Sequence, residues 1–197
     1  MNEEERVLKL ISKNNGILKV EQLKEINANN ITLTRLVKKG LIEKVARGMY
    51  IDINTIEDNY YTFQYKCPKA IFSHSTALYF HGLSDRTPIK FMVTVPAKYN
   101  SRLLKDKKYV FSYLKEDLYI IGITKIKTTF QNEIYCYDME RTICDIVRDK
   151  NKIDPSLFVD AMKRYIDRKD KRINKLYEYA EKFNIKNEIR KYVEVLL

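Results

Sequence analysis

Three short apolar patterns at helical spacing occupy the first forty residues, and this arrangement limits the fold more than any other feature of the sequence. Each pattern is followed by asparagine or glycine, and the apolar residues are Val7, Leu8 and Ile11, then Val20, Leu23 and Ile26, then Leu33, Leu36 and Val37. The third pattern begins near Asn30 and stops at Gly40, a residue typical of helix ends. Residues 41–51 then predict a two-stranded ribbon that turns at Arg47-Gly48. Together these elements predict a winged helix-turn-helix domain over residues 1–53.

The third helix of this domain has the polar surface that a DNA major groove requires. If its apolar residues are buried, its threonines and basic residues lie on other faces, where they can reach base edges and phosphates. The predicted DNA-binding residues lie on the second and third helices and on the ribbon: Lys19, Lys24, Thr32, Thr34, Arg35, Lys38, Lys39, Lys44 and Arg47. Exposed cations are often only solvated, and winged helices also dock proteins, so both alternatives remain open.

The charge of the whole chain favours a polyanionic partner. Lys and Arg number 37 and Asp and Glu 26, which gives a net charge of +11 at pH 7. An excess of this size indicates nucleic acid rather than an anionic membrane. The longest apolar runs are far shorter than the roughly 20 residues that span a bilayer, and the N-terminus is acidic where a secretory signal would be basic. We therefore expect a cytoplasmic protein without membrane contact.

Residues 54–197 have the pattern of a second, mixed α/β domain with a β-sheet and C-terminal helices, so the predicted fold class is α+β. A linker helix is expected over residues 54–66, and a second helix over Ser73–His81 with Ser73 as its cap. Segments rich in β-branched and aromatic residues predict strands at Ile89–Val95, Tyr109–Leu114, Leu118–Ile123, Lys125–Thr129 and Glu133–Tyr137. Helices are expected after Asp138 and Asp154, and two more complete the chain, the last with Ile189, Tyr192, Val193 and Leu196 facing inward.

The residues that could carry chemistry indicate neither a cofactor nor a metal site. The five glycines form no Gly-x-Gly or Walker loop, so nucleotide-binding loops of those kinds are disfavoured. Cys67, Cys136 and Cys144 lack a Cys-x-x-Cys pair and fit buried thiols. His74 and His81 are two helical turns apart, about 10 Å along the axis, which is too far to share one ion. We expect His81 to lie near a helix C-terminus, where a cationic ring suits the helix dipole.

Two charged segments of the second domain leave alternatives open. Arg141 and Asp145 are spaced i, i+4, which predicts a local ion pair. Asp138 and Glu140 precede them, and a nuclease-like site would need these carboxylates near Lys125 or Lys127, although the spacing fits no strict signature. The basic run 164–172 is either a solvated helix terminus or a second nucleic-acid contact.

Several segments, taken in order, resemble one known family. They are Arg47-Gly48-Met49-Tyr50, Ile71 to Leu83, Phe91-Met92-Val93-Thr94-Val95-Pro96 and Glu140-Arg141-Thr142-Ile143-Cys144-Asp145. With the N-terminal winged helix, they make nearly the whole chain similar to the AbiEi-type antitoxins. In the second domain the matched motif residues are Ser73, His74, His81, Arg141 and Asp145, whose role the pattern does not specify.

The resemblance implies a type IV toxin–antitoxin system of a phage-resistance (abortive infection) locus. The winged helix of such antitoxins binds inverted repeats in its own promoter and represses transcription, so two copies are expected to pair on the double-stranded DNA. The C-terminal domain supplies the antitoxin activity against a nucleotidyltransferase toxin, and a stable toxin–antitoxin complex is not expected. The resemblance implies no catalytic residue. The alternatives are a nuclease-like enzyme with a DNA-binding head and a ligand-sensing winged-helix transcription factor.

Overall fold

The computed structural model describes residues 1–196, and the chain divides into two compact units, Met1–Lys66 and Cys67–Leu197. Leu197 and the side chain of Leu196, which the sequence pattern predicts to face inward, lie outside the described residues. The linker helix expected to open the second domain belongs to the first unit. The division therefore follows Lys66 rather than residue 53.

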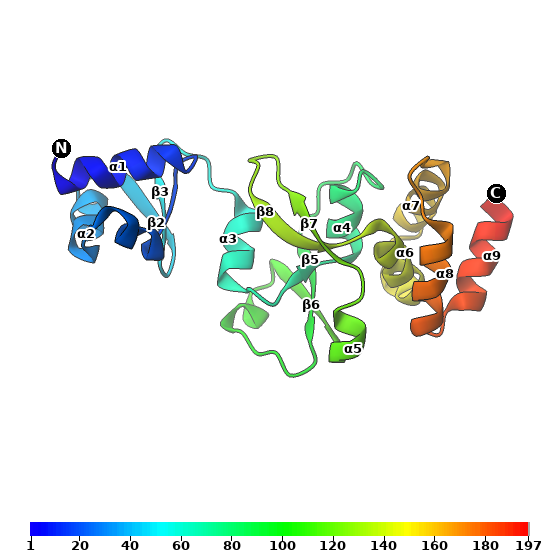
Figure 1. Cartoon of the computed structure of the whole chain (residues 1–197). Coiled ribbons are helices and arrows are strands. Elements are labelled where there is room, and N and C mark those ends of the chain that lie inside the picture. The colour runs from blue at the N-terminus through cyan, green and yellow to red at the C-terminus, as the bar shows by residue number, and fades with distance from the viewer. Residues whose placement is uncertain (197) are drawn as a thin grey trace. The chain divides into compact units, whose positions relative to one another are not determined.

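The first unit is a small helical domain with a three-stranded antiparallel sheet (Figure 1). Its elements are α1 (Glu3–Lys13), β1 (Ile17–Lys19), the 3-10 helix η1 (Val20–Ile26), α2 (Asn30–Lys38), β2 (Ile42–Ala46), β3 (Met49–Asp52) and α3 (Asn59–Lys66). The strand order is β1-β3-β2. The predicted apolar pattern forms the core, which contains Val7, Ile11, Leu18, Leu23, Leu33, Leu36 and Ile42. Three helical segments followed by a hairpin are the winged helix-turn-helix arrangement that the sequence predicts.

Two features of this unit differ from the sequence analysis. The second helical segment is a 3-10 helix, and strand β1 precedes it. Three residues are too short to show an alternating pattern, and β1 becomes a strand only because Ile17 pairs with Ile51 across the sheet. Val37, expected in the core, is 38% exposed, whereas Thr32 is 3% exposed.

The second unit combines a five-stranded mixed sheet with helices. Its elements are β4 (Ile71–Phe72), α4 (His74–Phe80), β5 (Phe91–Pro96), η2 (Arg102–Lys105), β6 (Tyr109–Leu114), α5 (Glu116–Tyr119), β7 (Ile123–Lys127), β8 (Glu133–Tyr137), α6 (Met139–Arg148), η3 (Lys150–Lys152), α7 (Pro155–Asp167), α8 (Ile173–Lys182) and α9 (Lys186–Leu196). The strand order is β6-β5-β4-β8-β7. This combination of sheet and helices confirms the predicted α+β class.

The sheet is joined in its middle by its shortest strand. Strand β4 pairs antiparallel with β5 through Ile71 and Phe72, and it pairs parallel with β8 through Phe72 and Cys136. The outer pairs are longer: β5 runs parallel to β6 over six residues and β7 runs antiparallel to β8 over five. The two halves of the sheet therefore meet along a narrow seam at β4.

The C-terminal helices α6 to α9 form a group at the end of the second unit (Figure 1) and share one apolar core. Helix α6 contributes Ile143, Ile146 and Val147, and its neighbours contribute Tyr165 and Leu176. The predicted caps are present, because the Asp138 side chain accepts a hydrogen bond from the Arg141 backbone and Asp154 accepts one from Leu157. The inward positions predicted for these helices are largely confirmed.

Two predictions in the second unit are wrong. The segment Leu118–Ile123 is not a strand, because residues up to Tyr119 form α5 and the chain then turns at Gly122. Ser73 stands at the N-cap of α4, yet its side chain makes no capping hydrogen bond. Within residues 1–196, no helix has both the length and the apolar character needed to cross a membrane.

Candidate functional site

One face of α2 is polar, exposed and lined by residues at helical spacing. Its members are Asn30, Ile31, Thr34, Arg35 and Lys38, all exposed, while Leu33 and Leu36 on the opposite face are buried. The Asn29 side chain accepts a hydrogen bond from the Ile31 backbone and begins the helix. This face presents an amide, a methyl-rich side chain, a hydroxyl and two cations. Such groups can recognise base edges, thymine methyls and phosphates in a major groove.

Sequence reasoning missed Asn30 and Ile31 because they lie at the expected helix start, outside the basic cluster. Ile31 is 58% exposed, which is unusual for a branched aliphatic side chain on a helix whose other face forms a core. The helical spacing of the sequence could have predicted that Asn30 and Ile31 belong to this face. Residues 30, 31, 34, 35 and 38 recur at i, i+1, i+4, i+5 and i+8, which places them on one face.

Two of the predicted DNA-binding residues are engaged inside the first unit. Thr32 is buried, and its hydroxyl donates a 2.6 Å hydrogen bond to the Glu3 carboxylate. The same carboxylate accepts a hydrogen bond from the Asn29 backbone, and these bonds lower the pKa of Glu3. Thr32 is therefore placed in the interior rather than on the surface where base reading was expected. Lys39 pairs with Glu4 at 2.6 Å.

The hairpin of β2 and β3 carries further cations and is braced by α3. Gly48 has a φ of +83°, which favours glycine, and Arg47 beside it is exposed. The Gly48 carbonyl accepts a hydrogen bond from the Val20 backbone at 2.9 Å and one from the Tyr65 hydroxyl at 3.3 Å. Helix α3, which sequence reasoning treated only as a linker, thus contacts the turn of the wing.

Three predicted lysines of the first unit have different surroundings. The ammonium of Lys19 lies 5.1 Å from the ring centre of Tyr61 and 5.6 Å from that of Tyr65, so this half-buried cation rests on α3. Lys44 lies over the Tyr50 ring at 6.0 Å. Lys24 is exposed on η1. Of the three, Lys24 has the most open surroundings.

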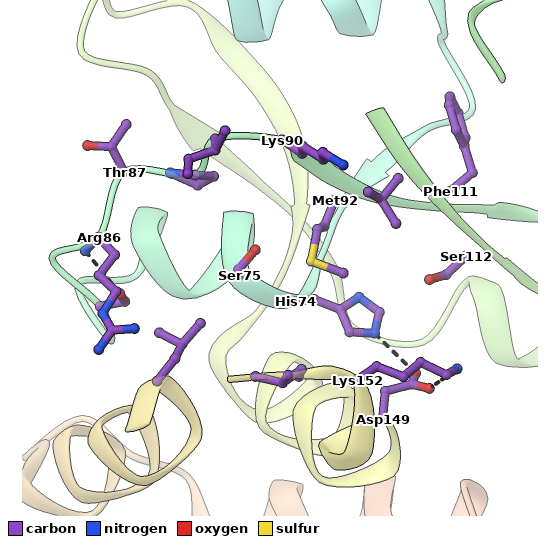
Figure 2. A pocket seen from close by; sticks show the side chains of 16 residues that line it. His74, Ser75, Arg86, Thr87, Lys90, Met92, Phe111, Ser112, Asp149 and Lys152 are labelled. Carbon is purple, nitrogen blue, oxygen red and sulfur yellow. Dashed lines mark hydrogen bonds and ion pairs between the residues drawn. The ribbon is translucent and has the colours of Figure 1, made fainter. Parts of the chain in front are cut away.

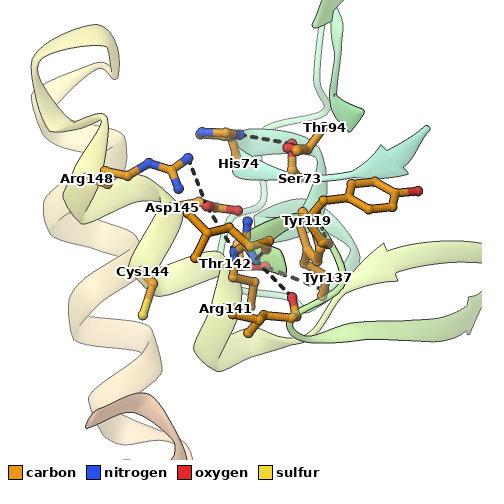
Figure 3. A network of polar contacts seen from close by, with 12 residues as sticks. Ser73, His74, Thr94, Tyr119, Tyr137, Arg141, Thr142, Cys144, Asp145 and Arg148 are labelled. Atoms are coloured by element: carbon orange, nitrogen blue, oxygen red, sulfur yellow. Dashed lines mark hydrogen bonds and ion pairs between the residues drawn. The ribbon is translucent and has the colours of Figure 1, made fainter. Parts of the chain in front are cut away.

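In the second unit, His74 and its neighbours form a polar chain, with the Asp149 end shown in Figure 2 and the Ser73 and Thr94 end in Figure 3. His74 is 1% exposed, its Nδ1 lies 2.9 Å from Ser73 Oγ, and its Nε2 lies 3.2 Å from Asp149 Oδ2. The Thr94 hydroxyl donates to Ser73 Oγ at 3.0 Å. Hydrogen bonds from His74 and then Lys152 hold the pKa of the Asp149 carboxyl well below its ordinary value. The sequence of contacts from Ser73 through His74 to Asp149 resembles a serine–histidine–aspartate triad. However, Ser73 is 0% exposed, so a substrate could not reach its hydroxyl.

A cavity of about 650 Å³ opens beside this chain, and His74, Met92 and Asp149 line it (Figure 2). Its walls come from the start of α4, the segment that follows α4, strands β5 and β6, and the segment from Asp149 to Leu157. The cavity volume lies within the range of small-molecule sites in proteins.

Arg141 and Asp145 form the i, i+4 ion pair that the sequence predicts, and the pair is fully buried (Figure 3). Both side chains are 0% exposed, and Arg141 Nε lies 3.1 Å from Asp145 Oδ1. The carbonyls of Leu118 and Ile121 accept hydrogen bonds from Arg141 at 2.7 and 2.9 Å, so the turn after α5 closes over the guanidinium. Asp145 lies between Arg141 and Arg148, which is 3.2 Å away.

Aromatic and backbone groups complete the Arg141 site. Its guanidinium carbon lies 4.1 Å from the ring centre of Tyr137, at the end of β8, and 4.2 Å from that of Phe183, at the end of α8. A Cβ at Gly122 would stand 2.6 Å from the Arg141 Cβ, so glycine is required for this close approach. Arg141 therefore ties β8, α5, α6 and the end of α8 together, which is a structural role.

The remaining carboxylates of α6 are held by cations of α8 rather than by Lys125 or Lys127. Asp138 lies 2.7 Å from the Lys175 ammonium, and the 0%-exposed Glu140 lies 2.8 Å from the Arg172 guanidinium. Lys125 pairs with Glu133 on the exposed face of β7. Within residues 1–196, no cluster of three histidine, cysteine, aspartate or glutamate side chains could hold a metal ion.

The basic run 164–172 is extensively paired. Arg164 pairs with Asp85 and with Asp160, and Arg168 pairs with Asp170. Arg172 completes the run through its contact with Glu140. Most of the arginine charge in this segment is thus already matched by carboxylates of the same unit.

His81 stands at the C-cap of α4, as expected, but its charge state differs from the prediction. Burial is the main cause that lowers the pKa of its imidazole, and the ring Nε2 donates a 2.6 Å hydrogen bond to the Tyr137 carbonyl. A neutral ring is therefore favoured over the cation that the helix dipole alone suggests.

The three cysteines are free and buried, as predicted, and burial raises the pKa of the Cys144 thiol to about 12.

The first unit has the fold and exposed helix face of a winged-helix DNA-binding regulator. Residues 5–51 match the family described as "Transcriptional regulator, AbiEi antitoxin". This match agrees with the resemblance over the winged-helix segment, which is similar to the AbiEi antitoxin family of transcriptional regulators. It supports an antitoxin and regulator role for the chain.

The fold of the chain is also seen in a solved structure. The RV2827C protein from Mycobacterium tuberculosis aligns with a TM-score of 0.64 at 11% sequence identity, over 90% of this chain and 70% of that one. At this identity the likeness concerns the fold alone. The search of curated proteins found no match.

Proposed function

We propose that the chain is an antitoxin and transcriptional autorepressor of a type IV toxin–antitoxin system. In this proposal the first unit binds inverted repeats in the promoter of its own operon, and two copies pair on the DNA. The second unit counteracts a nucleotidyltransferase toxin without forming a stable complex with it. The protein acts in the cytoplasm and has no enzymatic activity of its own.

The exposed face of α2 is the observation that carries this proposal. Thr34, Arg35 and Lys38 project from the helix that enters the major groove in winged-helix proteins, and Arg47 stands at the turn of the hairpin. Residues 1–196 show no carboxylate paired with Arg35, Lys38 or Arg47. These cations are free to replace the counterions of phosphates. The match to a regulator family over residues 5–51 supports the same assignment.

The direct test is fluorescence anisotropy with a labelled duplex of the operon's upstream region and a shuffled duplex of equal length. We expect tighter binding to the upstream duplex, two chains per duplex, and an affinity that falls steeply as salt rises. Equal and weak binding to both duplexes would contradict promoter recognition. Binding of a single chain would contradict pairing on inverted repeats.

A second test separates repression from antitoxicity in the full chain. The variant Arg35→Ala/Lys38→Ala/Arg47→Ala should lose repression of a promoter reporter because three phosphate-facing charges are removed. The same variant should still protect cells that express the toxin, because the second unit is unchanged. Loss of protection at equal protein abundance would contradict this division of roles. Co-purification of a stable complex with the toxin would contradict a type IV mechanism.

A further inference from the structure

We propose that the cavity beside His74 binds a small organic anion with an apolar body, and that Lys90 holds its anionic group. The cavity lies wholly within the second unit, and neither DNA binding nor antitoxicity assigns it a role. The proposal therefore stands apart from the promoter-binding function. It would make the second unit a receptor for a metabolite-sized ligand.

The apolar part of the cavity comes from several elements that meet at one place. Met92 and Val110 come from neighbouring strands β5 and β6, and Phe111 follows on β6. Ile153, which follows η3, and Leu157, in the first turn of α7, also line the cavity. A volume of about 650 Å³ with such walls suits a molecule with a ring system or a short acyl chain.

The exposed rim of the cavity also points to a ligand. Ile89 belongs to the lining and is 96% exposed, in the segment that leads into strand β5. An isolated exposed isoleucine is ordinary, but this one stands directly at the mouth of an apolar cavity. A bound apolar body would cover its side chain and remove that surface from water.

The charges of the lining favour an anion. Three cations, Arg86, Lys90 and Lys152, face a single lining carboxylate, Asp149. Arg86 is engaged by Asp154 and Ser156, and Lys152 is engaged by Asp149. Across residues 1–196, no carboxylate pairs with Lys90, so its ammonium remains available at the cavity.

The positions of these groups divide the cavity into an apolar middle and a cationic side. In Figure 2, Lys90 and Lys152 lie on opposite sides of Met92 and His74. Because the Asp149 carboxylate already neutralises Lys152, an anionic group placed there would meet a negative charge. The Lys90 side combines positive charge with adjacent apolar walls, which is the chemistry of an amphipathic anion.

The test uses the full-length protein and two dyes of similar shape. The dye 1-anilinonaphthalene-8-sulfonate has an aromatic body and one anionic group, and N-phenyl-1-naphthylamine is its neutral counterpart. Both become fluorescent in apolar surroundings. We expect saturable binding of one sulfonate dye per chain, tighter than binding of the neutral dye. Absence of a fluorescence increase, or tighter binding of the neutral dye, would overturn the proposal.

Variants then locate the bound dye. Lys90→Met keeps the length of the side chain and removes its charge, so the sulfonate dye should bind about fivefold more weakly while the neutral dye is unaffected. Ser112→Trp places a large ring in the cavity and should abolish binding of both dyes. Lys98→Met, an exposed lysine outside the cavity, is the matched control and should bind like the wild type. Unchanged sulfonate binding in Lys90→Met would overturn the role of Lys90.

Methionine methyl NMR distinguishes this cavity from a second apolar groove and does not depend on the folding of Ser112→Trp. The sequence has five methionines; Met92 lines the proposed cavity and Met162 lines a groove between α7 and α9. We expect the sulfonate dye to shift the Met92 methyl signal, assigned with Met92→Leu, and to leave Met162 in place. A shift of Met162 alone would show that the dye occupies the groove and would overturn the proposal.

Discussion

The exposed face of α2 and the basic run 164–172 look alike in sequence but differ in what their cations contact. Arg35 and Lys38 of α2 are exposed, and no carboxylate of residues 1–196 pairs with them. Arg164, Arg168 and Arg172 of the basic run each pair with at least one carboxylate of the second unit. The same residue type is therefore left unpaired and exposed in one region and stabilises the fold through ion pairs in the other.

The difference teaches that net charge is a poor guide to an anion-binding surface. A paired guanidinium has already lost water molecules to contact a carboxylate. A phosphate can bind such a guanidinium only after it displaces the carboxylate. A free cation on a rigid helix loses only its counterions. The predictions below test this distinction between paired and free cations, beginning with the largest expected effect.

The most fully paired cation should have the largest effect on stability. Arg141→Ala leaves the buried Asp145 carboxylate with Arg148 alone, and we expect the free energy of unfolding to fall by about 3–5 kcal/mol. Urea denaturation of the full chain, followed by circular dichroism, measures this loss. Arg190→Ala, which removes an exposed i, i+4 partner of Glu194, is the control and should change stability little. Equal losses in the two variants would contradict a special role for the buried pair.

Removal of free cations should affect DNA binding far more than removal of paired ones. Arg35→Ala/Lys38→Ala/Arg47→Ala should weaken binding to the upstream duplex by about 10- to 100-fold and reduce the salt slope by up to about 3. Arg164→Ala/Arg168→Ala/Arg172→Ala removes the same charge from the paired arginines of the basic run and should leave affinity nearly unchanged. Anisotropy over a salt series measures both. A comparable loss in the second variant would show that the basic run is also a nucleic-acid contact.

Uncharged residues on the same face of α2 should govern sequence preference rather than total affinity. Asn30→Ala and Ile31→Ala should each weaken binding to the upstream duplex by about tenfold and leave binding to a shuffled duplex unchanged. The salt slope should stay constant because no phosphate contact is lost. Competition between the two duplexes measures the preference. An equal loss on both duplexes would indicate that these side chains position the helix instead of reading bases.

The smallest effect concerns His81, whose ring signals are easily followed by NMR. Burial lowers the pKa of His81, so the unfolded chain binds a proton at a higher pH than the folded chain. The contribution of the neutral ring is complete above about pH 6.5 and is lost as the pH falls through the folded-state pKa. We expect the His81 ring signals to titrate below pH 6.5. His81→Gln, which can still donate to the Tyr137 carbonyl, should reduce the loss of stability between pH 6.5 and 5. Titration above pH 6.5 would contradict burial as the dominant cause.

Local patterns were enough to predict much of the fold. The winged helix follows from apolar spacing and from Arg47-Gly48, and the strands at Tyr109–Leu114 and Glu133–Tyr137 are where residue type predicts them. Leu118–Ile123 has the composition of a strand, yet α5 and the turn at Gly122 replace it because Arg141 uses the carbonyls there. Tertiary contacts decided this segment, and no local pattern contains them.

Prediction of the candidate site is limited in the same way, because contacts between distant residues are not visible in local sequence patterns. Arg35, Lys38 and Arg47 could be predicted as candidates because basic residues on a helix and a turn are visible in sequence, and the structure leaves all three exposed. Thr32 was misplaced because its partner, Glu3, lies 29 residues earlier. The burial of Arg141 was missed for a similar reason, since its aromatic and carbonyl partners are spread over α5, β8 and Phe183. Asn30 and Ile31 could have been found by extending the helical spacing one turn earlier.

The narrow seam at β4 has a consequence for how the second unit opens. Two backbone pairs with β5 and one with β8 join the two halves of the sheet, while longer ladders stabilise each half internally. We therefore expect slow amide hydrogen exchange within the β5–β6 and β7–β8 pairs and faster exchange at β4, through sub-global opening. The pairing of β4 with β8 brings together residues more than sixty positions apart. Closing so long a loop costs conformational entropy, so we expect this pairing to form late in folding.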